Sequence, residues 1–406
     1  MKFEHKKLNN GLNIVAEVNK DAQSAAIGFF TRTGSRDEID NINGVSHFLE
    51  HMLFKGTDEL SALDVNLSFD NLGALYNAFT SEENTVYFAA TLPEQFAEVT
   101  KLWCHLMRPA LRDDDFNMEK NVILEEIAMY KDLPHYDILE SCRALHFDKH
   151  PCAKSVLGSV DSIKSLTSKQ MREYFDRRYA PNNITATVAG NFDFEKICDL
   201  IEAGCGKWQP KQTTRKIEYF AGTAKKESQK KSNLNRLHIC IASPTVSYQD
   251  KRCYAAMLLA KIIGDDSGSR FFWALVDTAI AETATMQCEA MDGVGAYYSY
   301  INTDAKNGEK VMQIVEGIFK SLQKDKISEK ELQAAKNKVL SAITIKNEVP
   351  MGRLVELGFN WVYLGKYRPI EDEIQKIKDV SIEDLTTLLA DFPLMQYTQF
   401  SLGPEK

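Results

Sequence analysis

The sequence predicts an α+β protein of two domains, and three observations support this fold class. A single hydrophobic core rarely grows past about 250 to 300 residues, so a chain of 406 residues is expected to form two domains of roughly 200 residues each. Strand-like segments are followed by longer segments with helical spacing, which is typical of α+β domains. The second half echoes this order of elements, which indicates a diverged internal duplication.

The first half is expected to begin with two strands before the first helix. One follows the turn signal Asn9-Asn10-Gly11, and the other ends near Gly34. The first helix is expected at 44–54, where apolar residues recur at helical spacing before Gly56. The expected elements are strands at 12–18 and 25–32, a helix at 63–72, a strand-turn-strand at 74–92, helices at 94–107, 113–131, 136–147 and 168–178, and a strand at 184–188.

A polar stretch rich in Lys, Gln, Ser and Thr marks the predicted domain boundary. The prediction is an N-terminal domain of 1–212, a linker of 213–235 and a C-terminal domain of 236–406. The second half is expected to contain strands at 236–242 and 295–302 and helices at 249–263, 308–322 and 328–345.

Composition excludes several classes of protein. Hydrophobic residues make up 44% and charged residues 26%, which is the balance of a globular protein rather than a disordered one. The net charge of -8 gives no basic footprint for nucleic acid or for an anionic membrane. The chain has no apolar run long enough to span a membrane and no secretory signal, so a cytoplasmic location is expected. The eight cysteines form no C-x-x-C pair and are expected to be reduced thiols.

The segment His47-Phe48-Leu49-Glu50-His51 carries the chemistry of the first helix. Two imidazoles four residues apart lie on one helical face, so both can reach one metal ion. Glu50 is close enough to serve a metal-bound water as general base. Zinc lowers the pKa of a bound water to about 7, and such a site needs a third protein ligand and an open fourth position.

A downstream helix offers the third ligand. Glu119 and Glu126 are seven residues apart and share one helical face, along which Val122 and Ile123 also lie, so both carboxylates are expected to point inward. Glu125 lies off that face and is interpreted as a solvated charge. We therefore expect Glu126 to be the metal ligand and Glu119 to assist catalysis by orienting a histidine ligand or the water.

With these residues in place, the sequence resembles the pitrilysin or insulinase-like metallopeptidases of family M16, which include the mitochondrial processing peptidases. The resemblance rests on His47 to His51, on the 74 residues between His51 and Glu126, and on Glu119-Lys-Asn-Val-Ile-Leu-Glu-Glu126. Further matching segments are Gly34-Ser-Arg-Asp-Glu38, Gly73-Ala-Leu-Tyr-Asn-Ala-Phe-Thr80 and Tyr179-Ala-Pro-Asn-Asn183. The resemblance implies the M16 and LuxS-like metallohydrolase fold, with two homologous domains that each pack a mostly antiparallel sheet with helices, the second domain lacking zinc ligands.

The resemblance also implies substrate contacts and a partner. Asn77, Ala78, Phe79 and Thr80 would form an edge strand that takes up an extended peptide, although an ordinary hairpin remains the alternative. Half-size members of the family pair as homodimers, or with a related chain, to enclose a chamber.

A segment of the second half, Ser269-Arg270-Phe271-Phe272, resembles one that precedes an Arg and a Tyr assisting the substrate carbonyl, and Arg270 is a candidate substrate contact. Val276 and Glu282 stand where that Arg and Tyr would fall, so the pair is expected to be missing, with Tyr297 or Tyr298 as possible replacements.

The function expected is a zinc metalloendopeptidase with one Zn²⁺ per chain that hydrolyses unfolded peptides, with Glu50 as general base and a zinc-bound water as nucleophile. The alternative is a non-catalytic or partner-dependent scaffold subunit of a processing-peptidase-like complex, because fold alone does not fix function. A third reading, hydrolysis of a substrate other than a peptide, would require a pocket without a free strand edge.

Overall fold

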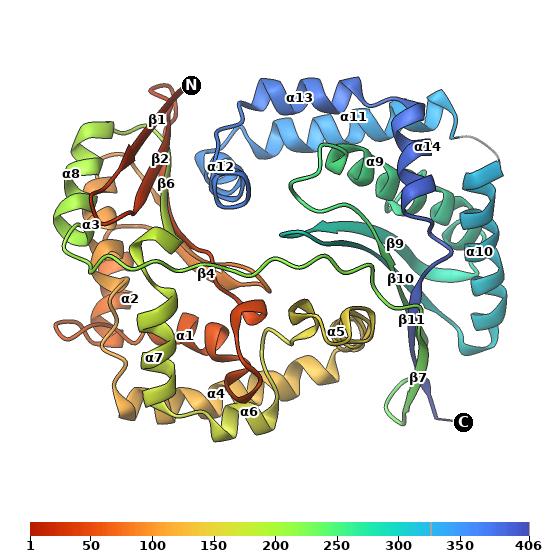
Figure 1. Cartoon of the computed structure of the whole chain (residues 1–406), viewed down its shortest axis with the longest axis horizontal. Coiled ribbons are helices and arrows are strands. Elements are labelled where there is room, and N and C mark those ends of the chain that lie inside the picture. The colour runs from red at the N-terminus through yellow and green to blue at the C-terminus, as the bar shows by residue number, and fades with distance from the viewer. Residues whose placement is uncertain (325–326, 406) are drawn as a thin grey trace. The chain divides into compact units, whose positions relative to one another are not determined.

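A computed structural model describes residues 1–324 and 327–405, which form two compact units (Figure 1). Each unit is assembled from three separate segments of the chain. The first unit contains Met1–Ala128, Lys154–Lys216 and Ile343–Arg368, and the second contains Met129–Ala153, Ile217–Ala342 and Pro369–Lys406. Each unit has one sheet with helices on both faces, so the predicted α+β class is confirmed.

The strands are β1 (Lys2–Lys7), β2 (Asn13–Val18), β3 (Ala25–Thr31), β4 (Leu75–Thr80), β5 (Thr85–Thr91), β6 (Ile184–Gly190), β7 (Lys226–Lys231), β8 (Leu237–Pro244), β9 (Ala281–Ala290), β10 (Gly295–Thr303) and β11 (Thr398–Pro404). The α-helices are α1 (Val45–Leu53), α2 (Ala62–Asn71), α3 (Phe96–Leu106), α4 (Asp113–Asp132), α5 (Pro134–Phe147), α6 (Val160–Ser165), α7 (Ser168–Arg178), α8 (Phe194–Cys205), α9 (Cys253–Gly264), α10 (Gly308–Lys324), α11 (Glu329–Lys346), α12 (Pro350–Leu364), α13 (Ile370–Asp379) and α14 (Ile382–Asp391). A π-helical turn, η5 (Phe272–Val276), precedes β9.

The sheet of the first unit has the strand order β1-β2-β6-β3-β5-β4. Only β2 and β6 pair in parallel, with Val15 opposite Thr187, and the other pairs are antiparallel. The central strands β3 and β6 are buried along their whole length, as expected of strands covered on both faces. β4 lies at one edge of this sheet.

Opposite faces of this sheet are covered by different parts of the chain. Ile27 and Phe29 of β3 join a core with residues of α1, α3, α7 and α8. Ala26 and Phe30 point the other way and pack with Leu354 of α12. A Cβ at Gly358 of α12 would lie 2.3 Å from the Phe30 ring, so the missing side chain lets helix and strand approach closely.

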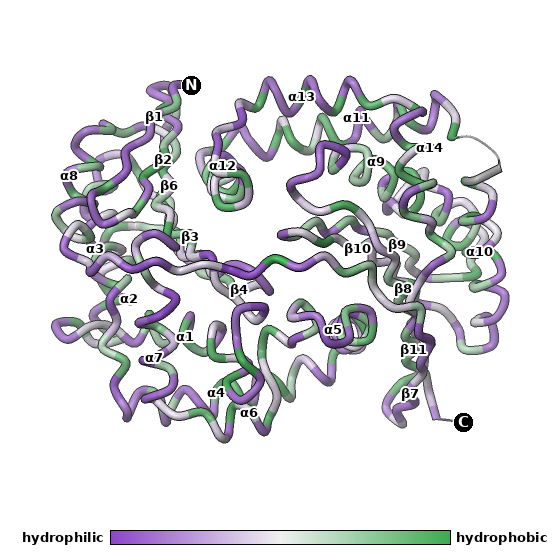
Figure 2. Tube along the Cα trace, viewed as in Figure 1, coloured by the Kyte–Doolittle hydropathy of each residue, from purple (hydrophilic) through white to green (hydrophobic). Residues whose placement is uncertain are grey.

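The sheet of the second unit has the order β7-β11-β8-β10-β9, and only β7 and β11 pair in parallel. α5 contacts β8 and β11, and α9 contacts β9. Strand β7 is exposed and strongly polar, purple in Figure 2, and it forms the edge of the sheet. Charged side chains on an edge strand discourage pairing with another chain.

Several elements differ from the sequence-based expectation. A third strand, β1, also precedes the first helix. It was not predicted because it is rich in Lys and Glu, as an edge strand with little buried surface can be. β7 lies inside the stretch predicted as linker. The domain limits of 1–212 and 236–406 stay a prediction. α12 covers the sheet of the first half of the chain, and α5 covers the sheet of the second half, so each unit contains a helix from the other half. No helix in the described part of the chain is long and apolar enough to cross a membrane.

Candidate metal centre

Helix α1 is fixed in place by its apolar face and by a carboxylate at its start. Gly44 precedes the helix with a φ of 92°, a conformation that favours glycine. Glu38 accepts hydrogen bonds from the backbone N–H groups of Gly44 and Ser46, both at 2.7 Å, and so caps free donors of the first turn. The apolar side chains of the helix are fully buried: Val45, Phe48, Leu49, Met52 and Leu53.

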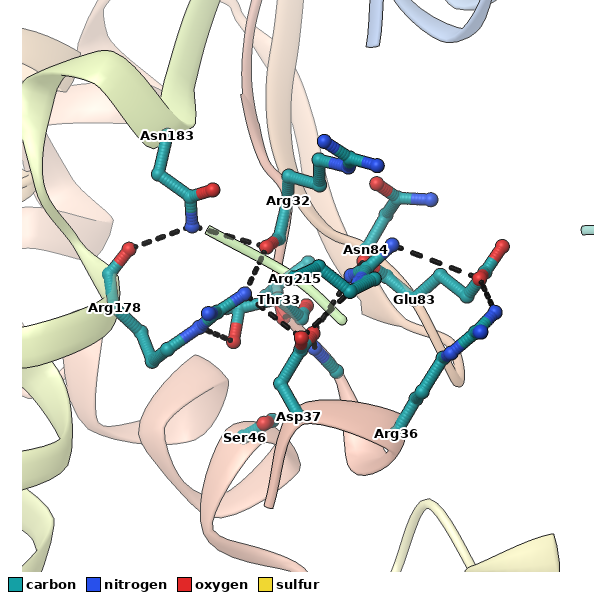
Figure 3. Close-up of polar contacts among 12 residues, drawn as sticks. Arg32, Thr33, Arg36, Asp37, Ser46, Glu83, Asn84, Arg178, Asn183 and Arg215 are labelled. Carbon is teal, nitrogen blue, oxygen red and sulfur yellow. Dashed lines mark hydrogen bonds and ion pairs between the residues drawn. The ribbon is translucent and has the colours of Figure 1, made fainter. Parts of the chain in front are cut away.

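Buried charges support the segment just before α1 (Figure 3). Asp37 pairs with Arg178 at 2.9 Å and with Arg215 at 2.6 Å, and Arg36 pairs with Glu83 at 2.6 Å. All five side chains are at most 6% exposed. Removing one partner from such a pair leaves an uncompensated buried charge, so the network holds this segment firmly.

Three side chains bring candidate ligand atoms together. Oε2 of Glu126 lies 3.7 Å from Nε2 of His47 and 3.6 Å from Nε2 of His51. Ligand atoms around a tetrahedral zinc ion, each about 2.0 to 2.1 Å from it, lie roughly 3.3 Å apart, so the spacing fits one ion with a small contraction. No other group of three such side chains gathers its ligand atoms this closely in the described part of the chain.

Burial keeps His47 neutral, as a metal ligand must be, and a hydrogen bond orients the ring of His51. Burial and the nearby His51 lower the pKa of His47 to about 3, so its imidazole is neutral at physiological pH. Burial lowers the pKa of His51, but its hydrogen bond to Glu119 and the charge of Glu126 outweigh burial and raise the pKa. Because Nδ1 of His51 donates to Oε1 of Glu119 at 2.8 Å, Nε2 of His51 is left to face Glu126.

Helix α4 supplies both predicted glutamates. Glu119 is 4% exposed, and Oε2 of Glu126 is buried without a hydrogen-bond partner among the described residues, which is the signature of an acceptor that a cation would satisfy. Burial raises the pKa of Glu126. Burial also raises the pKa of Glu119, but its bonds to His51 and Lys55 outweigh this and hold the pKa below its usual value.

The expectation that Val122 faces inward is wrong. Its side chain is 46% exposed, whereas Ile123 is fully buried. Val122 lies at the edge of the face shared by Glu119 and Ile123, since three residues advance a helix by only about 300°. Glu125 is exposed, in agreement with its interpretation as a solvated charge.

Glu50 is held by a hydroxyl rather than by a cation. Oγ1 of Thr80 donates to Oε2 of Glu50 at 2.5 Å. Burial raises the pKa of Glu50, with the Thr80 hydrogen bond acting in the opposite direction. A carboxylate with a raised pKa beside a metal cluster has the properties of a general base.

The other predicted contacts fall into two groups. Asn77, Ala78 and Phe79 lie with Thr80 on β4, whose described partner in the sheet is β5 alone, so one edge of its backbone is free of strand pairing. Arg270 belongs to the second unit, where its guanidinium pairs with Glu331 at 2.8 Å.

The two positions that depart from the family pattern also lie in the second unit. Val276 ends the turn η5, and Glu282 on β9 pairs with Arg236 at 2.8 Å. Tyr297 is 1% exposed and donates to the Ala256 carbonyl, and Tyr298 is packed in a core cluster, so neither hydroxyl offers an obvious replacement.

Two residues that support the site, Lys55 and Glu38, were given no role from the sequence. Nζ of Lys55 lies 2.5 Å from Oε2 of Glu119, and Glu38 caps α1. Lys55 follows His51 by four residues, the same spacing that separates the two histidines, so helical periodicity could have indicated it. No spacing rule points from Glu38 to α1, because the chain turns between them.

The fold and the cluster define a class: α+β proteins with two related sheets and a His-x-x-Glu-His centre on one of them. Residues 13–159 match the family Insulinase (Peptidase family M16), and residues 165–339 match the Peptidase M16 inactive domain. The chain belongs to the M16 peptidase family, as the sequence motifs predicted.

Two relatives extend the match along the chain. An uncharacterized zinc protease of Bacillus subtilis, YmxG, is 28% identical over 397 residues, 97% of each chain. The beta subunit of the mitochondrial-processing peptidase of Saccharomyces cerevisiae is 26% identical and covers 93% of this chain and 86% of its own length.

Two solved structures share the fold. A protease from Helicobacter pylori superposes with a TM-score of 0.91 at 21% identity, covering 99% of this chain and all of that one. A chain of complex III2 from Candida albicans superposes with a TM-score of 0.85 at 18% identity, covering 98% and 95%.

Proposed function

We propose that this chain is a zinc metallopeptidase with His47, His51 and Glu126 as zinc ligands and Glu50 as general base. The observation that carries the proposal is the geometry of the cluster. Three ligand atoms from two helices converge at the spacing of a tetrahedral site, and a buried carboxylate with a raised pKa stands beside them. The zinc proteases among its relatives support the choice of metal.

The chain's own residues define the chemistry. Bound zinc would act as a Lewis acid and would lower the pKa of a coordinated water to about 7. Glu50 accepts the proton of the attacking water and returns it to the leaving amine. Thr80 keeps the Glu50 carboxylate oriented, while Glu119 fixes the ring of His51.

The edge strand β4 favours an extended peptide as substrate. Its free backbone groups can pair with a peptide strand, and its last residue, Thr80, contacts the general base directly. Asn77, Ala78 and Phe79 would line the path of that peptide. A folded protein cannot present such a strand without unfolding locally, so unfolded peptides are the expected class.

A second M16 chain is the proposed partner, either as a homodimer or as a heterodimer that encloses the site. The yeast relative is named as a subunit, which supports assembly with another chain. Arg270 in the second unit remains a proposed substrate contact, but its present pairing with Glu331 would have to open.

The second candidate function is that of a non-catalytic or partner-dependent subunit. The likeness to a chain of complex III2 favours it, as do Val276 and Glu282 at the positions of the expected Arg and Tyr. A missing donor to the substrate oxyanion is often worth a factor of about 100 to 1000 in rate.

The test compares the native chain with Glu50→Gln, and Glu125→Gln serves as a control because Glu125 is exposed beside a proposed ligand. Zinc content and cleavage of a quenched peptide library are measured together. The proposal expects one zinc per chain in all three proteins and a loss of cleavage of at least about 100-fold in Glu50→Gln alone. Zinc without cleavage in any protein would favour the subunit, and absence of zinc from the native chain would refute the site.

A further inference from the structure

Lys55 lies just beyond the end of α1, and its side chain reaches α4. Nζ of Lys55 is 2.5 Å from Oε2 of Glu119, and the other carboxylate oxygen accepts the Nδ1 proton of His51 at 2.8 Å. The Glu119 side chain is 5% exposed and that of Lys55 is 26% exposed. One buried carboxylate is therefore held between a lysine and a histidine.

The backbone of Lys55 is also anchored. Its N–H donates to the Met52 carbonyl at 3.2 Å, which continues the last turn of α1. Its carbonyl accepts from the guanidinium of Arg112 at 3.1 Å, and Arg112 directly precedes α4. Lys55 is thus tied to the end of one ligand-bearing helix and to the start of the other.

We propose that Lys55 is a positioning residue of the metal centre, acting on His51 through Glu119. This inference rests on the proposed function, since it requires His51 to be a ligand. One oxygen of Glu119 is hydrogen-bonded to His51 and the other forms an ion pair with Lys55, which holds the carboxylate in one orientation and keeps Nε2 of His51 directed at the ligand set. Without Lys55 the carboxylate keeps only one partner and can turn away from the ring.

A purely structural ion pair is the competing explanation. Phe48 of α1 already stacks on Phe116 of α4, with ring centroids 4.7 Å apart, so the two helices have an apolar contact independent of Lys55. Loss of a structural pair would lower thermal stability and leave zinc affinity unchanged. Loss of a positioning residue would weaken zinc binding.

The experiment measures the dissociation constant of zinc by competition with a chelator, together with the thermal midpoint of the metal-free full chain. The variants are Lys55→Met and Lys55→Arg. Lys101→Met serves as control, because Lys101 is an exposed lysine that pairs with Glu98 of its own helix, α3. Removing a residue that hydrogen-bonds to a metal ligand costs about 10- to 100-fold in metal affinity. Lys55 contacts His51 only through Glu119, so its effect should lie at the lower end of this range. We expect Lys55→Met to weaken zinc binding about tenfold, Lys55→Arg to remain within about threefold, and Lys101→Met to match the native chain.

A double-mutant cycle tests the route through Glu119. In a Glu119→Gln background, Lys55→Met is expected to add little further loss of zinc affinity, because the carboxylate it holds is gone. Native affinity in Lys55→Met, or additive losses in the double variant, would overturn the inference. If Lys55→Met does not fold, Lys55→Gln takes its place with the same expectation. Failure of the native chain to bind zinc would instead overturn the proposed function itself.

Discussion

The two sheets share a strand order and differ in chemistry. In the first, β2-β6-β3-β5-β4 begins with a parallel pair and continues antiparallel, and β7-β11-β8-β10-β9 repeats both features in the second. Helix α1 follows β3, and α9 occupies the same place after β8. Helix α1 carries the two histidines of the proposed metal site, but α9 reads Cys-Tyr-Ala-Ala-Met-Leu-Leu-Ala-Lys-Ile-Ile-Gly, with no histidine or carboxylate. The two sheets therefore keep the same strand order, whereas the capacity to bind a metal depends on a few side chains that, among the described residues, only the first unit has.

Each sheet also receives one helix from the other half of the chain, and the two helices are anchored differently. α12 is fixed to the first sheet by a buried ion pair, in which Arg353 contacts Glu17 of β2 at 2.5 Å. α5 makes partly exposed ion pairs with the second sheet, such as Arg143 with Glu289 of β9 at 2.7 Å, but its buried anchor on β11 is a neutral pair, in which His146 shares a hydrogen bond of 3.1 Å with Thr398. A charged anchor and a neutral anchor should respond differently to mutation and to pH.

The largest effect is expected from His47→Ala. If only the first unit carries ligands, the zinc content should fall from about one per chain to nearly none, because a site with two protein ligands holds zinc weakly. Zinc content is measured by atomic emission after dialysis, with His105→Asn as control, because His105 is half-buried and lies outside the ligand set. Retention of half or more of the zinc would show that metal binds elsewhere and would break the contrast between α1 and α9.

The next largest effect concerns the charged anchor. Arg353→Met removes the ion-pair partner of the buried Glu17. The Tyr367 hydroxyl still donates to the Glu17 carboxylate at 2.6 Å, but it carries no charge. Losing one partner of a buried pair costs about 3 to 5 kcal/mol of unfolding free energy. Urea unfolding measures this loss, and Arg252→Met, which breaks the more exposed pair with Asp391, should cost less than about 1 kcal/mol. Equal losses in the two variants would contradict a special role for the α12 anchor.

The smallest effect concerns the neutral anchor and depends on pH. Burial, with a further contribution from Arg143, lowers the pKa of His146 to about 4, whereas the unfolded chain has an ordinary value near 6.5. Between these values the unfolded state binds a proton that the folded state does not, so stability falls as pH is lowered from 6.5 to 4 and is fully present above 6.5. The contribution is about 3 kcal/mol at most. Unfolding curves should show that His146→Asn has a flatter pH dependence than the native chain; parallel curves would refute this.

Much of the ligand cluster could be predicted because it depends on local spacing. His47 and His51 lie on one helix, and Glu119 and Glu126 share a face of another, so helical periodicity was sufficient. Strand β1 and strand β7 were missed because both are polar edge strands, whose pairing depends on a neighbour rather than on burial. The contacts of Thr80 with Glu50 and of Arg353 with Glu17 join residues 30 and 336 positions apart, and a single sequence contains no signal for such pairs.

The exchange of helices also has a consequence for synthesis on the ribosome. The last strand of the first sheet ends at Gly190, but α12, which covers Phe30 and Val86 on that sheet, ends only at Leu364. Translation at about 5 to 20 residues per second needs roughly 10 to 35 seconds to cross this interval. A first sheet that forms before α12 is made would leave Ala26, Phe30 and Val86 exposed to water for that time, so this face can be completed only late in synthesis.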